Sequence, residues 1–205
     1  MSAAPSAWGD TMVLFDWNGT VVLDADRARD ALNAVLVARQ RPALSHAGFA
    51  REFSLPMAAM FDRLGAGDVF EAEQEWNAHM AARASVARAG AHEALRRLAD
   101  GGAYLGVVSA AARSSVEYDL DSLGFEVAWA ALEAPTTDKL AVLRRYRGER
   151  ARAVYVGDTA YDMVCARTAG YLAVAVAGGY TPVDALRAAG ADHVISSLLD
   201  LPALL

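Results

Sequence analysis

From Gly90 onward, short apolar segments alternate with segments of helical periodicity, and no other feature of the sequence constrains the fold as strongly. Several of the expected helices stop at a glycine, the residue preferred just past a helix C-terminus. We expect helices over residues 91–98, 114–123, 139–147, 161–169 and 183–189, and strands over residues 104–108, 127–130, 153–156, 172–176 and 193–195. Such alternation predicts an α/β fold with a doubly wound parallel sheet and helices on both of its faces.

An unbroken apolar run near the N-terminus, Val13-Leu14-Phe15, predicts one more strand that is buried on both faces. Asp16 follows this run at once, and Asn18, Gly19 and Thr20 are residues that favour turns. Asp16 should therefore emerge at the carboxyl end of the strand. In open parallel sheets, ligands bind at that edge.

The region between this strand and Gly90 has the periodicity of helices only, apart from residues 21–24, which should extend the strand or form a small hairpin. We expect helices over residues 26–39, 46–52, 57–64 and 69–86. Ser45 and Asp68 are expected to cap two of them. The predicted domains are an α/β core of residues 1–24 and 88–205, and a small all-helical insert of residues 25–87.

The composition is that of a globular protein, with 55% apolar and 21% charged residues. A net charge of -6 argues against a nucleic-acid or acidic-membrane surface. Cys165 is the single cysteine, so no intrachain disulfide can form. Residues 1–10 do not resemble a signal peptide, and no stretch has the roughly 18 apolar residues of a membrane span. We therefore expect a cytoplasmic protein.

Polar side chains follow the expected strands at the points where these end. Ser109 follows residues 104–108, Asp158 follows the strand over 153–156 and Gly157, and Asp162 lies four residues later. Lys139, the only lysine among 19 basic residues, opens a helix. If the strands are parallel neighbours, these side chains converge with Asp16 on one edge. Crowded carboxylates need a cation, and oxygen ligands suit Mg²⁺; one divalent ion and one lysine would balance three carboxylates, so that a phosphate ester could bind.

Four segments in this order resemble the four motifs of the haloacid dehalogenase-like (HAD) superfamily: residues 15–20, residues 107–109, Lys139, and residues 156–162. The chain is most similar to the phosphoglycolate phosphatase and phosphoglucomutase branch, whose helical cap is inserted after the first motif. The resemblance extends over nearly the whole chain. It implies a Rossmann-like core with a small helical cap.

The resemblance implies a role for each of the polar residues that we expect to converge. Asp16 would be the nucleophile that carries the phosphoryl group, as an aspartyl-phosphate. Ser109 and the amide of Ala110 would hold phosphate oxygens, and Lys139 would neutralise both the nucleophile and the transferred group.

The metal ligands implied by the resemblance come from two of the motifs. Asp16, the backbone carbonyl of Asn18 and Asp158 would contact Mg²⁺ directly, and Asp162 would do so through water. The metal contact of residue 18 does not depend on its side chain.

The chain departs from the phosphatases of the superfamily at Asn18, where they have a second aspartate that serves as acid and base. An amide cannot do this work. Either the leaving group needs no proton, or another residue of the insert supplies one, or the site binds phosphorylated ligands with little chemistry. The candidates for a proton donor in the insert are His46, His79, Glu52 and Asp62.

Three apolar residues are candidates for the substrate pocket: Trp17 beside the nucleophile, and Phe53 and Leu55 where the family has a specificity loop. Packing is the alternative role for each. We therefore expect a Mg²⁺-dependent phosphohydrolase acting on a small phosphorylated metabolite. A weakened phosphometabolite-binding protein and a phosphotransferase or mutase are the alternatives.

Overall fold

The computed structural model describes residues 7–54, 57–81 and 85–205. The chain divides into two compact units. The α/β unit comprises Met1–Leu23 and Val86–Leu205, and the helical unit comprises Asp24–Ser85. The boundaries therefore lie within two residues of those expected from the sequence.

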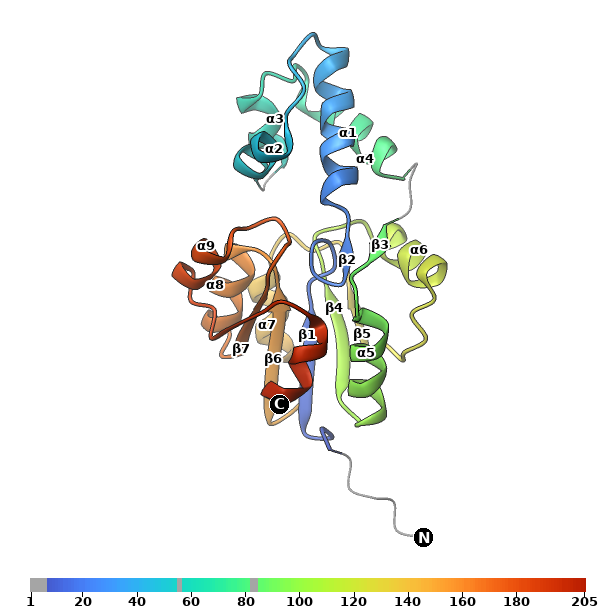
Figure 1. Cartoon of the computed structure of the whole chain (residues 1–205), viewed down its shortest axis with the longest axis vertical. Helices are drawn as coiled ribbons and strands as arrows, with labels where there is room; N and C mark the ends of the chain where they lie inside the picture. Colours follow the sequence, from blue (N-terminus) through green and yellow to red (C-terminus); the bar gives the residue numbers. More distant parts are fainter. Residues whose placement is uncertain (1–6, 55–56, 82–84) are drawn as a thin grey trace. The chain divides into compact units, whose positions relative to one another are not determined.

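The α/β unit is built on a six-stranded sheet with the order β5-β4-β1-β6-β7-β8, in which every pair of neighbours is parallel (Figure 1). The strands are β1 (Thr11–Phe15), β4 (Tyr104–Val108), β5 (Ala131–Glu133), β6 (Arg152–Gly157), β7 (Leu172–Val176) and β8 (His193–Ile195). The helices are α5 (Ala91–Asp100), α6 (Arg113–Leu123), α7 (Lys139–Tyr146), α8 (Ala160–Thr168), α9 (Val183–Ala188) and a 3₁₀ helix, η1 (Leu198–Leu204). The predicted doubly wound α/β fold is confirmed.

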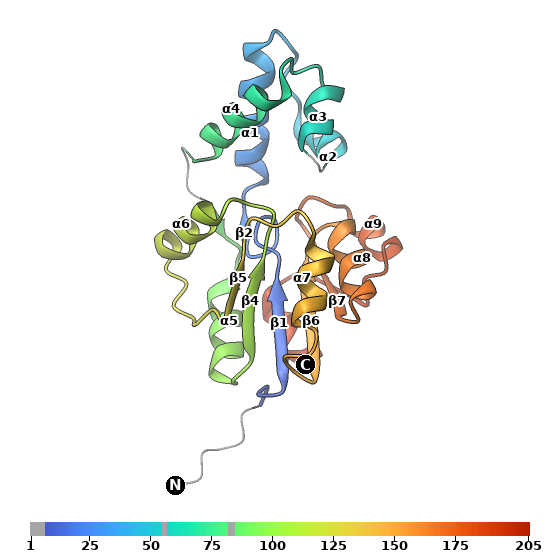
Figure 2. The ribbon, with the colours of Figure 1, turned by 180° about the vertical axis from the view of Figure 1, so that it is seen from behind.

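Helices cover both faces of this sheet, as Figure 2 also shows from behind. On β1, the side chains of Val13 and Phe15 pack in one apolar core with α5, α6 and η1. Those of Met12 and Leu14 pack in a second core with α7, α8 and α9. Because side chains of a strand alternate between its faces, the unbroken apolar run of β1 fills both cores at once.

The strand expected over residues 127–130 is wrong, because the edge strand β5 begins only at Ala131. Its register is set by β4, where Gly106 lies beside Ala131. Val127 and Trp129 are apolar because they pack against the core, and not because they belong to the sheet. The helix η1 was not expected, although Ser197 and Asp200 form a capping box at its start.

A two-stranded antiparallel ribbon lies where the chain leaves and re-enters the α/β unit. It consists of β2 (Val22–Leu23) and β3 (Val86–Ala87), with Leu23 paired to Val86. The helix expected over residues 69–86 is therefore wrong at its end, because α4 covers Val69–Ala81 and Val86 belongs to β3. Of residues 21–24, which were expected to extend the strand or form a small hairpin, Val22 and Leu23 pair with this distant segment, and Val22 also forms a local bridge with Asn18.

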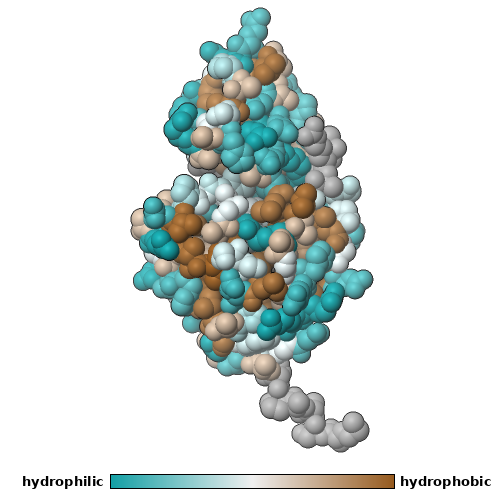
Figure 3. Space-filling model, in the orientation of Figure 1, coloured by the Kyte–Doolittle hydropathy of each residue, from teal (hydrophilic) through white to brown (hydrophobic). Residues whose placement is uncertain are grey.

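The helical unit contains α1 (Ala25–Ala38), α2 (His46–Glu52), α3 (Met57–Arg63) and α4. Both predicted caps are confirmed: Ser45 accepts from the Gly48 N–H at 3.1 Å, and Asp68 accepts from the Glu71 N–H at 3.0 Å. The visible surface of this unit is mostly polar (Figure 3). No helix within the described ranges is long and apolar enough to cross a membrane.

Candidate active site

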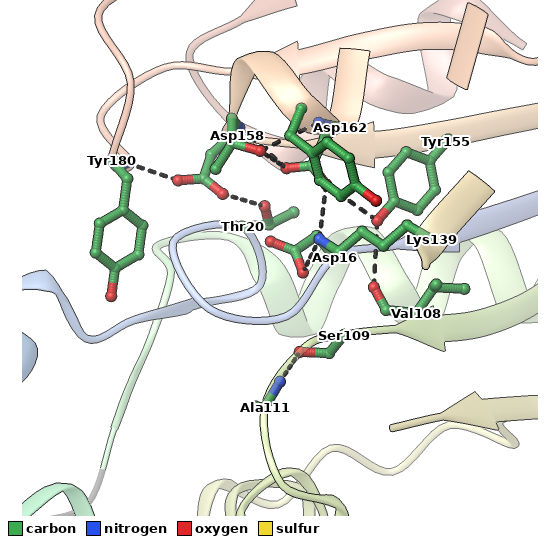
Figure 4. A network of polar contacts seen from close by, with 12 residues as sticks. Asp16, Thr20, Val108, Ser109, Ala111, Lys139, Tyr155, Asp158, Asp162 and Tyr180 are labelled. Atoms are coloured by element: carbon green, nitrogen blue, oxygen red, sulfur yellow. Dashed lines mark hydrogen bonds and ion pairs between the residues drawn. The ribbon is translucent and has the colours of Figure 1, made fainter. Parts of the chain in front are cut away.

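The carboxyl ends of β1, β4 and β6 bring Asp16, Ser109 and Asp158 to one edge of the sheet. Phe15 lies beside Val107 and Val156 in the register of the sheet, so Asp16 leaves the sheet one residue earlier than Ser109 and Asp158, at the same edge. Figure 4 shows these side chains together. The convergence expected from the strand ends is present in the structure.

Three buried carboxylates form the centre of this edge. Asp16, Asp158 and Asp162 each offer one oxygen, and these oxygens lie within 4.8 Å of one another. Asp162 joins the other two because it lies in the first turn of α8, four residues after Asp158. Such a group of hard oxygen donors can hold a metal ion.

Lys139, the first residue of α7, places its ammonium between two of these carboxylates. Its Nζ lies 2.8 Å from Oδ1 of Asp16 and 2.7 Å from Oδ1 of Asp162, and the residue is only 4% exposed. Burial alone would lower the pKa of Lys139, but Asp16 and Asp162 raise it well above its ordinary value. The lysine therefore stays charged inside the site.

Burial works in the opposite direction on the carboxylates. It raises the pKa of Asp16 to about 6, although Lys139 opposes the change. Burial also raises the pKa of Asp158 well above its ordinary value, and the charges of Asp16 and Asp162 raise it further. One ammonium thus does not balance three buried acids, and a bound cation would relieve their repulsion.

Asp158 is held by two loops. Its Oδ1 accepts from the Thr20 hydroxyl at 3.0 Å, and its Oδ2 accepts from the Tyr180 N–H at 2.6 Å. A Cβ atom at Gly19 would lie 2.3 Å from Oδ2, and one at Gly179 would lie 2.1 Å from it. The two glycines are therefore required for the loops to close around this carboxylate.

Asp162 also caps the helix on which it lies. Its Oδ2 accepts from the N–H of Thr159 at 3.0 Å and from the hydroxyl of the same residue. Oδ1 faces Lys139 and lies 3.3 Å from the buried hydroxyl of Tyr155, which is 3.2 Å from the carbonyl of Val108. Tyr155 was not predicted as a site residue, because a tyrosine within an apolar strand has the sequence pattern of a core residue.

Ser109 occupies the turn that follows β4. Its N–H donates to the carbonyl of Glu133 at 3.0 Å, and its Oγ accepts from the N–H of Ala111 at 3.1 Å. Ala110, between them, is exposed. The hydroxyl and the backbone of this turn lie at the same sheet edge as Asp16 (Figure 4).

Comparison with known proteins agrees with this geometry. The family model described as haloacid dehalogenase-like hydrolase matches residues 13–176, which include Asp16, Ser109, Lys139, Asp158 and Asp162. The chain belongs to the haloacid dehalogenase-like hydrolases.

Relatives of this hydrolase lie in the phosphoglycolate phosphatase-like branch. The chain is 31% identical over 212 residues to a phosphoglycolate phosphatase of Caulobacter vibrioides, covering 93% of this chain and 88% of that protein. A predicted phosphoglycolate phosphatase from Haemophilus somnus has the same fold, with a TM-score of 0.83, 17% identity and coverage of 98% and 99%. A haloacid dehalogenase-like protein from Streptococcus pneumoniae has a TM-score of 0.81, 19% identity and coverage of 96% and 98%.

Of the three substrate-pocket candidates, only two lie among the described residues of this hydrolase, since Leu55 falls outside them. Trp17 is fully buried, where its indole N–H donates to Asp119 at 3.0 Å and its ring meets those of Phe125 and Trp129 edge-on. The structure thus gives Trp17 a packing role. In the helical unit, the aromatic rings of residues 49 and 53 pack together with their centroids 5.0 Å apart.

Asn18 is half-buried in the turn that follows β1, two residues after Asp16. A second residue that was not predicted, Arg88, lies near this turn, and its guanidinium donates to the carbonyls of Gly19 and Thr20. From the sequence, an arginine between a helical region and a glycine resembles an ordinary surface residue. Its buried position becomes visible only when β3 pairs with β2 and brings Arg88 next to the turn after β1.

Proposed function

We propose that this hydrolase is a Mg²⁺-dependent phosphatase that acts on a small phosphorylated metabolite through a phosphoryl group carried on Asp16. One observation supports the proposal above all: a buried edge of the sheet brings together three carboxylates and one ammonium, those of Asp16, Asp158, Asp162 and Lys139. The name of the Caulobacter relative supports phosphate as the transferred group.

The donor set fits a magnesium ion, because it offers only hard oxygen atoms and the buried carboxylates lack sufficient countercharge. Asp16, Asp158 and the backbone carbonyl of Asn18 would hold the ion, with Asp162 acting through water. When bound, the ion would supply charge neutralisation and orientation of the phosphoryl group. The site would then have no net charge and could accept an anion.

The chain's own groups then account for the transfer. One oxygen of Asp16 attacks phosphorus as the bond from phosphorus to the leaving oxygen breaks, and water later attacks the same phosphorus to free Asp16 and release phosphate. Lys139 donates to Oδ1 of Asp16 and balances charge on the transferred group. Ser109 and the amide of Ala110 would donate to the phosphate oxygens.

Protonation of the leaving group is the step that this site is least equipped to catalyse. Asn18 cannot donate a proton to the departing oxygen or take one from water. The site is therefore best matched to donors whose leaving oxygen departs without a proton, such as acyl phosphates. Four titratable residues of the helical unit stay candidates for an alternative donor: His46, His79, Glu52 and Asp62.

A substrate panel with Mg²⁺ tests the proposal. It contains acetyl phosphate as an activated donor and 2-phosphoglycolate as an alkyl phosphate, and phosphate release is measured for the native chain, Asp16→Ala and Asp16→Asn. We expect release from acetyl phosphate to disappear in both Asp16 variants. It should persist in Asp100→Asn, which makes the same change at an exposed residue of the same unit. Unchanged release from the Asp16 variants would contradict the proposed nucleophile.

Asn18 also favours a second candidate function, in which the chain binds phosphorylated metabolites and hardly turns them over. That function would be supported if the native chain and Asn18→Asp were both inactive on every donor while a phosphorylated ligand still bound. If the phosphoryl group of acetyl phosphate appears on an added alcohol instead of water, the third candidate, a phosphotransferase or mutase, is favoured.

A further inference from the structure

Arg88 is buried close to the site without touching a carboxylate of the cluster directly. It follows β3 at once, is 7% exposed, and uses each of its three nitrogen atoms for a backbone carbonyl. Nε donates to Thr20 at 2.7 Å, Nη1 donates to Ala177 at 2.9 Å, and Nη2 donates to Gly19. Burying a guanidinium is costly unless its donors find acceptors, and here the backbone accepts one hydrogen bond from each of the three nitrogen atoms.

The three carbonyls belong to the same two loops that hold Asp158. Gly19 and Thr20 lie in the turn after β1, and the Thr20 hydroxyl donates to Oδ1 of Asp158. Ala177 begins the loop after β7, in which the Tyr180 N–H donates to Oδ2 of Asp158. These loops are therefore joined twice, once through Asp158 and once through Arg88.

The charge of Arg88 also interacts with one carboxylate of the site, that of Asp158. Burial lowers the pKa of its guanidinium, and the nearby negative charge of Asp158 acts in the opposite direction. The guanidinium thus places a positive charge within electrostatic reach of Asp158, whereas Lys139 contacts Asp16 and Asp162.

We propose that Arg88 is a positioning residue for the metal-holding edge. By fixing the carbonyls of Gly19, Thr20 and Ala177, it keeps the turn after β1 and the loop after β7 closed around Asp158. The inference rests on the proposed magnesium site. Arg88 itself acts through the backbone and through Asp158, without contact to metal or substrate.

Binding of Mg²⁺ alone, without substrate, tests this role. Arg88→Met removes the donors, Arg88→Lys keeps the charge but not the three-way geometry, and Arg147→Met is the matched control. Arg147 lies in the same unit and donates to the Gly170 carbonyl at 2.7 Å, away from the cluster. By calorimetry, we expect the dissociation constant for Mg²⁺ to rise about 10- to 100-fold in Arg88→Met, as for other residues that orient metal ligands.

The dissociation constant for Mg²⁺ should rise less in Arg88→Lys, and it should not rise in Arg147→Met. With acetyl phosphate, the Mg²⁺ concentration for half-maximal rate should rise in the Arg88 variants, while kcat at saturating Mg²⁺ stays near that of the native chain. A merely structural role would lower the melting temperature, but it would not raise the Mg²⁺ requirement while kcat at saturating Mg²⁺ stays unchanged. If Arg88→Met fails to fold, the Mg²⁺ affinity of Arg88→Lys tests the proposal instead.

Two outcomes overturn the inference in distinguishable ways. If the native chain binds Mg²⁺ and folded Arg88 variants bind it as tightly as Arg147→Met, only the role of Arg88 is overturned. If the native chain does not bind Mg²⁺ at all, the proposed function fails and the role of Arg88 fails with it.

Discussion

The side chain of Asn18 separates two tasks that an aspartate at the same position would combine. Its backbone carbonyl can still face a metal ion, but its amide cannot exchange a proton. In the proposed function, Asn18 therefore keeps the backbone contact to the metal and loses the capacity to act as acid and base.

Asn18→Asp should restore proton transfer to the leaving oxygen. We expect the rate of 2-phosphoglycolate hydrolysis to rise about 10²- to 10⁴-fold, the usual contribution of a positioned acid or base. The kcat/KM for acetyl phosphate, which reports transfer to Asp16 and not the later attack of water, should change far less, because its leaving group departs without a proton. Asn77→Asp, which makes the same substitution at an exposed position of α4, is the control. An equal gain with both donors would argue against this explanation.

The raised pKa of Asp16, about 6, predicts that Mg²⁺ competes with protons for the site. Below that pH the protonated acid prevails, and it must lose its proton before it can bind the ion. Apparent Mg²⁺ affinity should therefore increase about tenfold in total as pH rises from 5 to 7, and most of this rise should occur below pH 6, where Asp16 must lose its proton. Calorimetry in two buffers of different ionisation enthalpy measures the protons released. An affinity independent of pH over this range would contradict the prediction.

At the scale of elements, the site depends on how closely loops approach one another at the sheet edge. The loop after β7 reaches Asp158 only because Gly179 has no side chain, since a Cβ there would meet Oδ2 at 2.1 Å. No neighbour lies within 4 Å of a Cβ built at Gly148, which makes it a matched position in the same unit.

Gly179→Ala should push the loop away from Asp158 and lengthen the hydrogen bond from the Tyr180 N–H. We expect weaker Mg²⁺ binding and a lower melting temperature. Gly148→Ala should leave Mg²⁺ binding unchanged, and its stability should be equal or up to about 1 kcal/mol higher because the unfolded chain loses freedom. Calorimetry and thermal unfolding of the two variants provide the comparison. Equal Mg²⁺ binding by both would show that the loop tolerates the added methyl group.

The helices and central strands could be predicted because their signals are local. The run of β1, the start of α7 at Lys139 and the cap at Ser45 follow from periodicity and from residue chemistry. The edge strand β5 and the ribbon of β2 and β3 could not, since their positions are set by pairing with distant segments.

The same distinction applies to the site. The polar residues at strand ends could be predicted because parallel strands end together. Arg88 and Tyr155 could not, because their roles depend on contacts with backbone carbonyls far away in the sequence. A sequence pattern indicates which chemical groups a segment carries but not which remote carbonyls they meet.

At the scale of the whole molecule, every described member of the proposed metal site lies in the α/β unit. The chain leaves this unit after Leu23 and returns at Val86, and these two residues are paired in an antiparallel ribbon. Metal binding and the helical unit should therefore be separable.

Replacement of residues 24–85 by a two-residue Asn-Gly turn tests this separation. Such a turn suits antiparallel partners, so it should join Leu23 to Val86 as a hairpin. We expect the shortened chain to fold cooperatively and to bind Mg²⁺ with a dissociation constant within a few-fold of that of the full chain. Far-UV circular dichroism and calorimetry measure these properties. Loss of Mg²⁺ binding by a folded shortened chain would show that the helical unit contributes to the metal site.

The ribbon of β2 and β3 has a consequence for how proteins of this architecture can diversify. The chain leaves the α/β unit at Leu23 and returns at Val86, and these residues are paired. A segment of different length can therefore be inserted between them while the six-stranded sheet keeps its register. The inserted segment can thus change in sequence and length while the carboxylate cluster at the sheet edge stays in place.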